Sequence, residues 1–485
     1  MLILLIILCV LTAGLFPLDL FVVPVPEWVI FAMLAAIAAV TVLLFVRGRS
    51  KRPAKVVSVC LAAVTALTAL GGIYLDPYFN SWSLNVVGAE PTLRFDTVLT
   101  ADAARADLDY AMKFLQKNHP ALMDGLPADM RQAYEQTKAD IKAAGSVTVN
   151  GLARMTERIF AMLHDAHTSV FVSDMPLYLK HYYKWKQGDW TLIALNGLTI
   201  RELLDRTTDI YSYEAESWHL EDLKNDLLSL RGLDYLGFDT DAGVEYTFES
   251  PDGEQRSETY YTDDFVTYHE YCVFNDIDIA AQDTTFVSYT VDEEKSLALL
   301  TLSECNYNSE YINCLREMFT EVKEKGIRNV AVDIRDNGGG NDMTAVEFIR
   351  YLDTDGYKYA SECMRLGFLT SPRSADYIVN ERYTDLTFTG KVWVLTSAGS
   401  FSSAMLFPQY IKDNGLGTLI GEPPGNDPNG CGEVTMFKAP NSGIRLSISC
   451  KQFFRADRDC PDKYVMPDIP CDGDKALDTL YEIIA

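Results

Sequence analysis

Three long apolar segments open the sequence and constrain the fold more than any other feature. They cover residues 2–23, 28–46 and 56–75, and each approaches the roughly 20 apolar residues that a helix needs to cross a bilayer. A cleaved signal peptide is the alternative for the first segment, but that segment lacks a basic start and a second one follows closely. We therefore expect three transmembrane helices.

The charge between these segments sets their orientation. The linker 47–55 holds five basic residues in nine, and short loops rich in Lys and Arg stay in the cytoplasm. The N-terminus is then inside, and the third segment leads the chain out. We expect a multi-pass protein of the cell membrane that contacts lipid through residues 1–75 and exposes everything after Asp76 on the extracytoplasmic side.

The part outside the membrane is strongly acidic. The chain of 485 residues has a formal net charge of −26, while residues 1–75 carry five basic and two acidic side chains, which leaves −29 for the rest. Such a surface repels phosphate backbones, so we expect no nucleic acid as a partner. The hydrophobic content of 48% indicates folded domains with apolar cores.

Eight of the ten cysteines lie outside the apolar segments. No Cys-x-x-Cys pair occurs among them, so the sequence gives no support for a zinc ribbon or a thioredoxin-like site. Disulfides are compatible with an extracytoplasmic location. Cys460 and Cys471 are the best candidates for such a pair.

Beyond the apolar segments the sequence changes character three times. Residues 76–100 are typical of an extended linker. Residues 101–180 place apolar side chains three and four positions apart, which predicts a helical module. Residues 181–295 are rich in Tyr, Thr, Trp and Val between turn signals, which favours short strands. Residues 296–475 alternate apolar strands with helical runs, which indicates a layered α/β core.

Two loops of this core have the composition of a reaction site. In residues 330–342 (VAVDIRDNGGGND) an apolar strand runs into Asn337 and three glycines. Consecutive glycines leave N–H groups uncovered, which suits an oxyanion hole or an anion site at a helix N-terminus. An ordinary tight turn between a strand and a helix is the alternative. The glycines match neither a Walker loop nor a dinucleotide-binding fingerprint.

The second loop lies in residues 394–407 (VLTSAGSFSSAMLF), where a strand gives way to a helix near Ser402. Ser402 or Ser403 is expected in the first turn, close to free backbone N–H groups and the positive end of the helix dipole. Because serine is a common N-cap, a capping role is the alternative to a nucleophilic one. The Gly-x-Ser-x-Gly elbow of α/β-hydrolases is absent.

These two loops, together with "GTLIGEPPG" and the upstream "LHDAHTSVF" (163–171), occur in the order found in a known family. The sequence resembles the carboxyl-terminal-processing, or tail-specific, serine peptidases, which include the tricorn-type proteases. The resemblance extends over residues 105–470. It implies a crotonase-like or Clp-protease-like layered α/β core and a PDZ-like or cap region over residues 181–295, and it requires no metal or cofactor.

The resemblance also implies roles for single residues. Ser402 falls on the position of the nucleophile, and Ser403 is the neighbouring alternative. The backbone N–H groups of Ser403 and of Gly339 are expected to form the oxyanion hole.

The general base separates two branches of the family. Members with a Ser–Lys dyad have a lysine where this chain has Asp427, and Lys438 and Lys451 are poor substitutes. The tricorn-like branch uses a histidine from a motif that "HDAHTS" matches, which points to His167. An imidazole is a workable base at neutral pH. A helix cap, or a metal site with His164, is the alternative role for this histidine.

The acid of the triad has no direct match in the sequence, because the glutamate that the family places before its terminal Pro-Asp motif is missing. Asp462 is nearest to that position and Asp459 is next, whereas Asp468 is expected to be structural. Asp165, between the two histidines, is interpreted as a solvated or capping carboxylate.

These assignments predict a membrane-anchored serine endopeptidase that cleaves polypeptides outside the cytoplasmic membrane through an acyl-enzyme, with Ser402, His167 and Asp462 as the triad. Two alternatives stay open. The first is an inactive family member that binds a peptide or another ligand, and the second is a membrane receptor or scaffold. The sequence leaves the oligomeric state open.

Overall fold

The computed structural model describes residues 2–21, 27–46, 52–79, 93–180, 186–187, 190–277, 285–374 and 377–485. The chain divides into two compact units. The first is built mainly from the residues up to Glu90, and the second is built from Pro91–Val434 and Lys438–Ala485.

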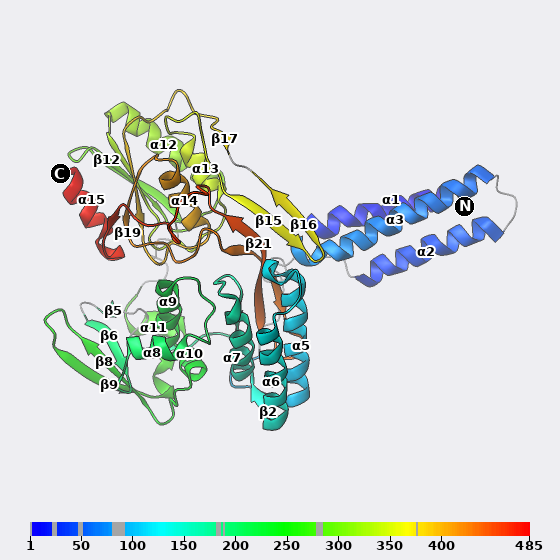
Figure 1. The fold of residues 1–485 in the computed structure, drawn as a ribbon, viewed down its shortest axis with the longest axis horizontal. Coiled ribbons are helices and arrows are strands. Elements are labelled where there is room, and N and C mark those ends of the chain that lie inside the picture. The colour runs from blue at the N-terminus through cyan, green and yellow to red at the C-terminus, as the bar shows by residue number, and fades with distance from the viewer. Residues whose placement is uncertain are drawn as a thin grey trace. The chain divides into compact units, whose positions relative to one another are not determined.

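The first unit contains three apolar helices, α1 (Leu2–Phe21), α2 (Glu27–Val46) and α3 (Arg52–Phe79) (Figure 1). Two stretches, Trp28–Val46 and Arg52–Tyr74, are long and apolar enough to cross a membrane. The apolar stretch found in α1 is the shorter Leu2–Leu15. Two of the three predicted transmembrane helices are therefore candidate spans by length and composition, and the prediction of three is not confirmed.

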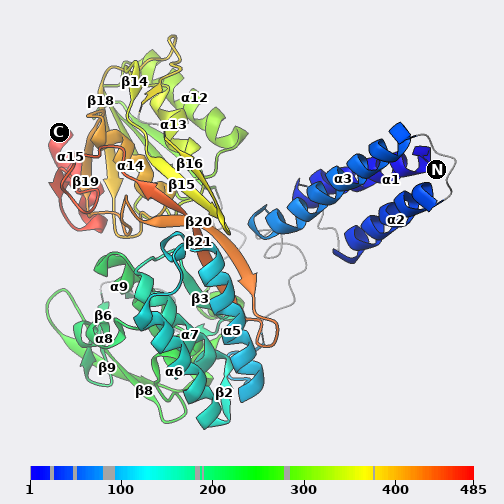
Figure 2. The ribbon, with the colours of Figure 1, turned by 45° about the vertical axis from the view of Figure 1, so that its right-hand side comes forward.

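The second unit begins with the predicted helical module, in which α5, α6 and α7 pack against one another (Figure 2). Helix starts are set by side-chain caps, because Thr100 accepts from the N–H of Ala103 and Thr148 accepts from the N–H of Gly151. The elements are β1 (Val98–Thr100), α5 (Ala101–Asn118), η1 (Pro120–Leu122), α6 (Ala128–Ala144), β2 (Ser146–Thr148), α7 (Val149–Phe160), η2 (Ala161–Leu163) and β3 (Ser169–Phe171).

The next region combines short helices with a small antiparallel sheet in the order β5-β6-β8-β9. Its elements are β4 (Tyr178–Leu179), β5 (Lys186–Gln187), β6 (Trp190–Leu195), β7 (Leu198–Thr199), α8 (Ile200–Thr207), α9 (Glu216–Leu227), α10 (Leu230–Leu236), β8 (Val244–Glu249), β9 (Gln255–Tyr260), η3 (Thr262–Asp264), β10 (Phe265–Val266) and α11 (Tyr268–Phe274).

The core contains a six-stranded sheet in the order β11-β12-β13-β18-β19-β22. Every neighbouring pair is parallel except β11 with β12. Parallel strands are buried on both faces, and the helices supply this cover through two apolar clusters, one around Phe319 and Phe348 and one around Leu480. The elements are β11 (Val287–Asp292), β12 (Leu297–Leu302), α12 (Ser309–Lys325), β13 (Asn329–Asp333), α13 (Met343–Ile349), β18 (Lys391–Thr396), α14 (Ser403–Asp413), β19 (Thr418–Gly421), β22 (Ile469–Pro470), η5 (Gly473–Lys475) and α15 (Ala476–Ile484).

A second sheet joins the helical module to this core. Its order is β16-β15-β21-β20, and β3 pairs with β21 so that Val170 lies opposite Leu446. The long strand β21 therefore connects the two parts of the unit (Figure 2). The remaining strands are β14 (Gly356–Tyr357), β15 (Ser361–Leu366), β16 (Leu369–Arg373), β17 (Ile378–Val379), β20 (Cys431–Lys438) and β21 (Arg445–Phe454).

The α/β core and the helical region before it are thus confirmed. The suggested disulfide is wrong, because all ten cysteines are free. Cys460 contacts the carboxylate of Asp462 instead, and the thiol of Cys471 accepts a hydrogen bond from Thr479.

Candidate active site

The glycine turn and the serine loop meet because they follow neighbouring strands. β13 and β18 are parallel and adjacent, so their carboxyl ends lie at the same edge of the sheet, where ligands of α/β proteins usually bind. The N–H of Phe401 donates to the carbonyl of Asn337 at 2.9 Å. The side chain of Asn337 in turn donates to the carbonyl of Leu302. These contacts fasten both loops to the sheet.

Ser402 occupies the N-cap position of α14 but does not act as a side-chain cap. Its backbone has φ 56° and ψ −121°, a strained conformation for a residue other than glycine and one that is common at functional sites. The N–H of Ser402 donates to Oδ1 of the buried Asn426 at 2.8 Å, which holds this geometry. Within the described residues its hydroxyl makes no hydrogen bond, so the capping alternative fails.

Gly339 makes room for this serine. A Cβ atom at Gly339 would lie 2.6 Å from Cβ of Ser402, and the glycine has φ 107°. Both the close contact and the positive φ therefore exclude a side chain at this position. The N–H of Gly339 already donates to Oδ1 of Asn337 at 2.9 Å. The geometry therefore argues against Gly339 as an oxyanion donor.

Among the described residues, the N–H groups of Gly340 and Ser403 have no hydrogen-bond acceptor and are therefore available instead. The carbonyl of Gly339 accepts from Cys305, and in a trans peptide the N–H of Gly340 points the opposite way. The N–H of Gly340 therefore points toward α14. The Gly340 carbonyl lies on the same side, because it accepts from the hydroxyl of Ser403 at 2.8 Å. Ser403 is the first residue of α14, where backbone N–H groups lack helical partners.

His167 reaches the serine loop from the helical module. It lies in the turn between η2 and β3, and its carbonyl accepts from the hydroxyl of Ser447 on β21 at 2.7 Å. The His167 ring packs on the ring of Phe401, with centroids 4.5 Å apart. Its side chain is 10% exposed, and neither ring nitrogen has a hydrogen-bond partner among the described residues. The structure thus brings His167 beside the residue that precedes Ser402, without a hydrogen bond to Ser402 itself.

Asp165 is the carboxylate that faces His167. Its Oδ1 lies 3.7 Å from Nδ1 of His167 and accepts from the His167 N–H at 3.0 Å. Its Oδ2 accepts from the hydroxyl of Thr168 at 2.6 Å. Burial alone would raise the pKa of Asp165, but the hydrogen bond from His119 and the nearby imidazole of His167 outweigh burial and hold the pKa well below its usual range. Asp165 is buried at 2% exposure, so its interpretation as a solvated carboxylate is wrong, and its side chain bonds within the turn to His167 and Thr168 instead of capping a helix.

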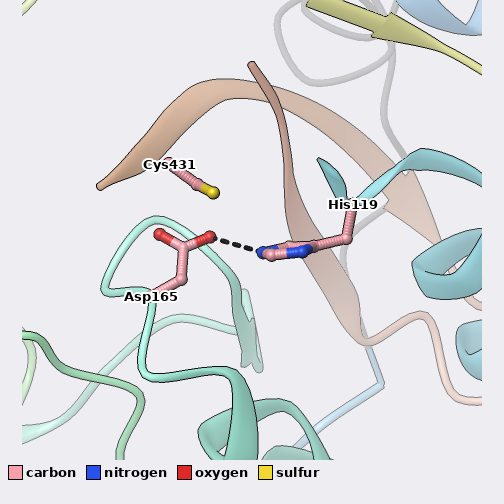
Figure 3. A group of neighbouring side chains, drawn as sticks. All are labelled: His119, Asp165 and Cys431. Carbon is pink, nitrogen blue, oxygen red and sulfur yellow. Dashed lines mark hydrogen bonds and ion pairs between the residues drawn. The ribbon is translucent and has the colours of Figure 1, made fainter. Parts of the chain in front are cut away.

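A second histidine, His119, contacts the Oδ2 atom of Asp165 (Figure 3). Nε2 of His119 lies 3.0 Å from Oδ2 of Asp165. The N–H of Ala121 donates to Nδ1 of His119, so that nitrogen has no proton and Nε2 is the donor. His119 therefore faces the carboxylate as a neutral donor with a fixed orientation.

Glu214 approaches the same group from the segment before α9. One of its oxygens lies within 4.8 Å of a His167 ring nitrogen and of an Asp165 oxygen. Its Oε2 accepts from the N–H of Asp427 at 2.5 Å, while Oε1 is buried without a partner among the described residues. Burial, followed by the charge of Asp165, raises the pKa of Glu214 to about 9, so this carboxyl is protonated at neutral pH.

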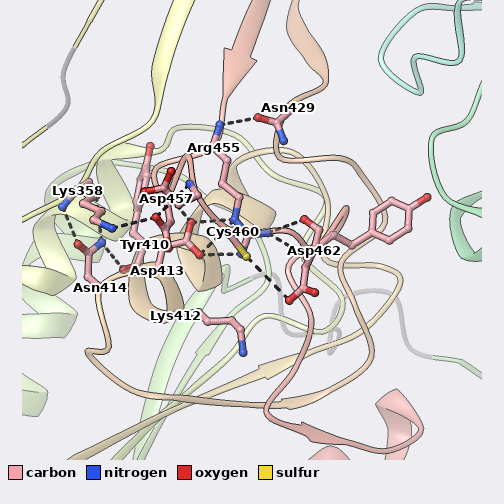
Figure 4. A network of polar contacts seen from close by, with 12 residues as sticks. Lys358, Tyr410, Lys412, Asp413, Asn414, Asn429, Arg455, Asp457, Cys460 and Asp462 are labelled. Atoms are coloured by element: carbon pink, nitrogen blue, oxygen red, sulfur yellow. Dashed lines mark hydrogen bonds and ion pairs between the residues drawn. The ribbon is translucent and has the colours of Figure 1, made fainter.

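Asp462 has a different environment (Figure 4). Its carbonyl accepts from the guanidinium of Arg455, which forms a buried ion pair with Asp413 at 2.7 Å. Its carboxylate is exposed and contacts Cys460. Asp459, the second candidate, is also exposed. Within the described chain neither carboxylate contacts His167, and the geometry favours Asp165 instead.

The structure does not favour a lysine as the general base. Lys451 forms ion pairs with Glu362 and Glu433 at 3.1 and 3.3 Å. Burial would lower its pKa, but these carboxylates outweigh burial and raise it, so Lys451 is protonated and unsuited to act as a base. Asp427 stands where a dyad lysine is expected and holds Glu214 through its N–H.

Two groups in the described residues have the composition of a metal site. One consists of His119, Asp165 and Cys431, and the other of Asp165, His167 and Glu214. In the first, His119 and Asp165 bond to each other, and burial raises the pKa of the Cys431 thiol, which donates to Gln452. The side chains of this group therefore have hydrogen-bond partners without a metal ion. His164, the suggested metal partner of His167, belongs to neither group.

Residues 296–471 match the model of peptidase family S41. The α/β core of the chain is therefore an S41 peptidase domain. It is accordingly a serine peptidase, a hydrolase. No curated protein matches its sequence.

Solved structures resemble the S41 peptidase in fold. Mature CPAF complexed with lactacystin is 11% identical, with a TM-score of 0.56, over 79% of this chain and 97% of that chain. The photosystem II D1 C-terminal processing protease is 13% identical, with a TM-score of 0.43, over 79% and 97%. The tricorn protease is 13% identical, with a TM-score of 0.36, over 79% and 37%. The structural similarity to CPAF covers more of the chain than residues 296–471, which match the family model.

Sequence reasoning missed three residues of this candidate site: Asn426, Glu214 and His119. Asn426 and Glu214 carry no motif, and their positions depend on loops that cross between distant segments. His119 lies in "NHP" at the end of a predicted helix. A histidine beside a proline is a visible signal, but only the fold reveals its contact with Asp165.

Proposed function

We propose that this S41 peptidase is an active, membrane-anchored endopeptidase in which Ser402 attacks the peptide carbonyl. The unpartnered hydroxyl at the start of α14 supports this role more than any other observation. The strained backbone of Ser402 places its Cβ close to the glycine turn at Gly339.

His167 takes the proton of Ser402 and returns it to the leaving amine. Its placement on the ring of Phe401 supports this role. The missing hydrogen bond to Ser402 is compatible with it, because catalytic hydrogen bonds often tighten only when substrate is bound. Asp165 orients the imidazole and stabilises its cation, and the neutral His119 holds Asp165 in place.

The N–H groups of Ser403 and Gly340 stabilise the negative charge that develops on the carbonyl oxygen. We propose Gly340 in place of Gly339, because the N–H of Gly339 is occupied by Asn337. Gly339 instead permits the close approach of Ser402. The protonated Glu214 lies near His167 and avoids a second negative charge beside Asp165.

A fluorophosphonate probe tests the nucleophile in the full-length chain in detergent. We expect wild type and Ser403→Ala to be labelled, because the Ser403 hydroxyl does not react and its N–H is kept. We expect Ser402→Ala to remain unlabelled. Labelling of Ser402→Ala at the wild-type rate, or none of wild type, would refute the assignment.

The membrane part of the proposal rests on the apolar helices. Large apolar side chains such as Trp28, Val46 and Leu67 point outward at 72%, 75% and 72% exposure, as is typical of surfaces that face lipid. With the basic linker 47–55 inside, the catalytic unit lies outside the membrane. Protease added to intact cells should then digest it. Digestion only after permeabilisation would place it inside.

A further inference from the structure

A cavity of about 300 Å³ lies next to the segment that carries His167. Ala166, the neighbour of His167, lines it, and so does Trp218, whose ring stacks on Phe401 with centroids 3.9 Å apart. Phe401 precedes Ser402 in the chain. The cavity is at the small end of the range for ligand pockets, which fits a single side chain of a bound peptide.

The wall that α9 contributes is acidic. Asp222 and Asp226, one helical turn apart, both line the cavity. The carboxyl of Asp226 accepts from the hydroxyl of Tyr211 at 2.6 Å. Within the described residues the carboxyl of Asp222 has neither a hydrogen bond nor an ion pair, although burial and then the nearby Asp226 raise its pKa to about 8. The side chain of Asp222 is half-buried, so its carboxyl remains within reach of a group that enters the cavity.

The basic residue of the cavity does not neutralise this wall. Arg231 lines the cavity but forms an ion pair at 2.8 Å with Asp174, which lies outside the lining. A third acid, Glu157, also lines the cavity, and it accepts from the N–H groups of Val170 and Ser212. Three acidic side chains and one basic side chain therefore line the cavity, and within the described residues Asp222 is the acid that has neither a hydrogen bond nor an ion pair.

We infer that this cavity is a substrate pocket for a cationic side chain, lysine or arginine, close to the cleaved bond. The inference rests on the proposed function and adds a substrate class to it. A cation in the cavity lowers the pKa of Asp222, so the carboxyl releases its proton to water and forms an ion pair with the cation. Trp218 supplies an aromatic wall for the aliphatic stem of the side chain. An uncharged side chain of equal length gains only the apolar contacts.

Binding to full-length Ser402→Ala protein in detergent tests the pocket without any turnover. The probes are peptides of otherwise small residues in which one lysine is moved through successive positions, each paired with a norleucine peptide of the same register. We expect one position at which lysine binds about 10-fold more tightly than norleucine. Adding Asp222→Asn should remove that difference, while Glu221→Gln, a surface change on the same helix, should keep it.

Less than a twofold preference for lysine at every position would overturn the inference, as would a preference that survives Asp222→Asn. Substitution of the unpartnered Asp222 breaks no hydrogen bond, and an unchanged melting temperature confirms folding. Turnover assays separate the two proposals. Lysine-selective binding without Ser402-dependent turnover refutes only the proposed function, and turnover without selectivity refutes only the pocket.

Discussion

The two halves of the catalytic site are built in different ways. The half that contains Ser402 follows directly from two parallel strands, and backbone contacts within the core hold it. The half that contains His167 is assembled from His119, Asp165 and Glu214, which lie on separate segments outside the six-stranded sheet. The serine is therefore fixed by the sheet, whereas the base depends on docking between the helical module and β21. Mutations in the two halves should differ accordingly.

The largest effect is expected where the two halves act together. Ser402→Ala and His167→Ala should each lower kcat by about 10⁴-fold or more, and the double variant should be no worse than either one, because residues of a triad act as a unit. Steady-state kinetics on one peptide checks this. Losses that multiply in the double variant would show that the two halves work independently.

Asp165→Asn tests the support of the base. An amide cannot stabilise the imidazolium, so we expect kcat to fall by about 10³ to 10⁴-fold with KM nearly unchanged. Asp462→Asn serves as the matched control, since Asp462 is exposed beside Cys460, and it should retain activity within about twofold. The reverse ranking would restore Asp462 as the acid.

Gly339→Ala tests the rigidity of the serine half. The new Cβ would lie 2.6 Å from Cβ of Ser402 at a positive φ, so we expect a loss of stability of about 1–3 kcal/mol and at least a tenfold loss of kcat. Gly338→Ala is the control, because a Cβ there meets no atom within 4 Å. Equal melting temperatures for the two variants would contradict the proposed close approach.

Glu214→Gln is expected to have the smallest effect at neutral pH, because the carboxyl is already protonated. The pKa of Glu214 is about 9 in the folded protein and about 4.3 in the unfolded chain. Between these two pH values the folded state carries the proton and the unfolded state does not. Wild-type stability should therefore fall with rising pH in this window, relative to Glu214→Gln, by up to about 1.4 kcal/mol per pH unit. Melting temperatures of both proteins at pH 5 and pH 9 check this, and a constant difference would refute the raised pKa.

Much of the serine half is predictable from sequence, because strand periodicity and the order of motifs place Asn337 and Ser402 at the ends of buried strands. The histidine half is only partly predictable. His167 is marked by its motif, but its carboxylate partner depends on which loop reaches it in space. Asp165 lies two positions away and resembles an ordinary turn residue, and Glu214 has no local signal. Asp462, which the sequence suggested as the acid, belongs instead to the hydrogen-bond network around Arg455.

The central claim is that the imidazole of His167 activates the hydroxyl of Ser402. The most direct measurement is the rate at which a fluorophosphonate labels Ser402, mapped by mass spectrometry, in wild type and in His167→Gln. We predict that the substitution slows labelling by about 100-fold or more, as loss of a general base requires. Labelling of Ser402 at the wild-type rate in His167→Gln would contradict the account.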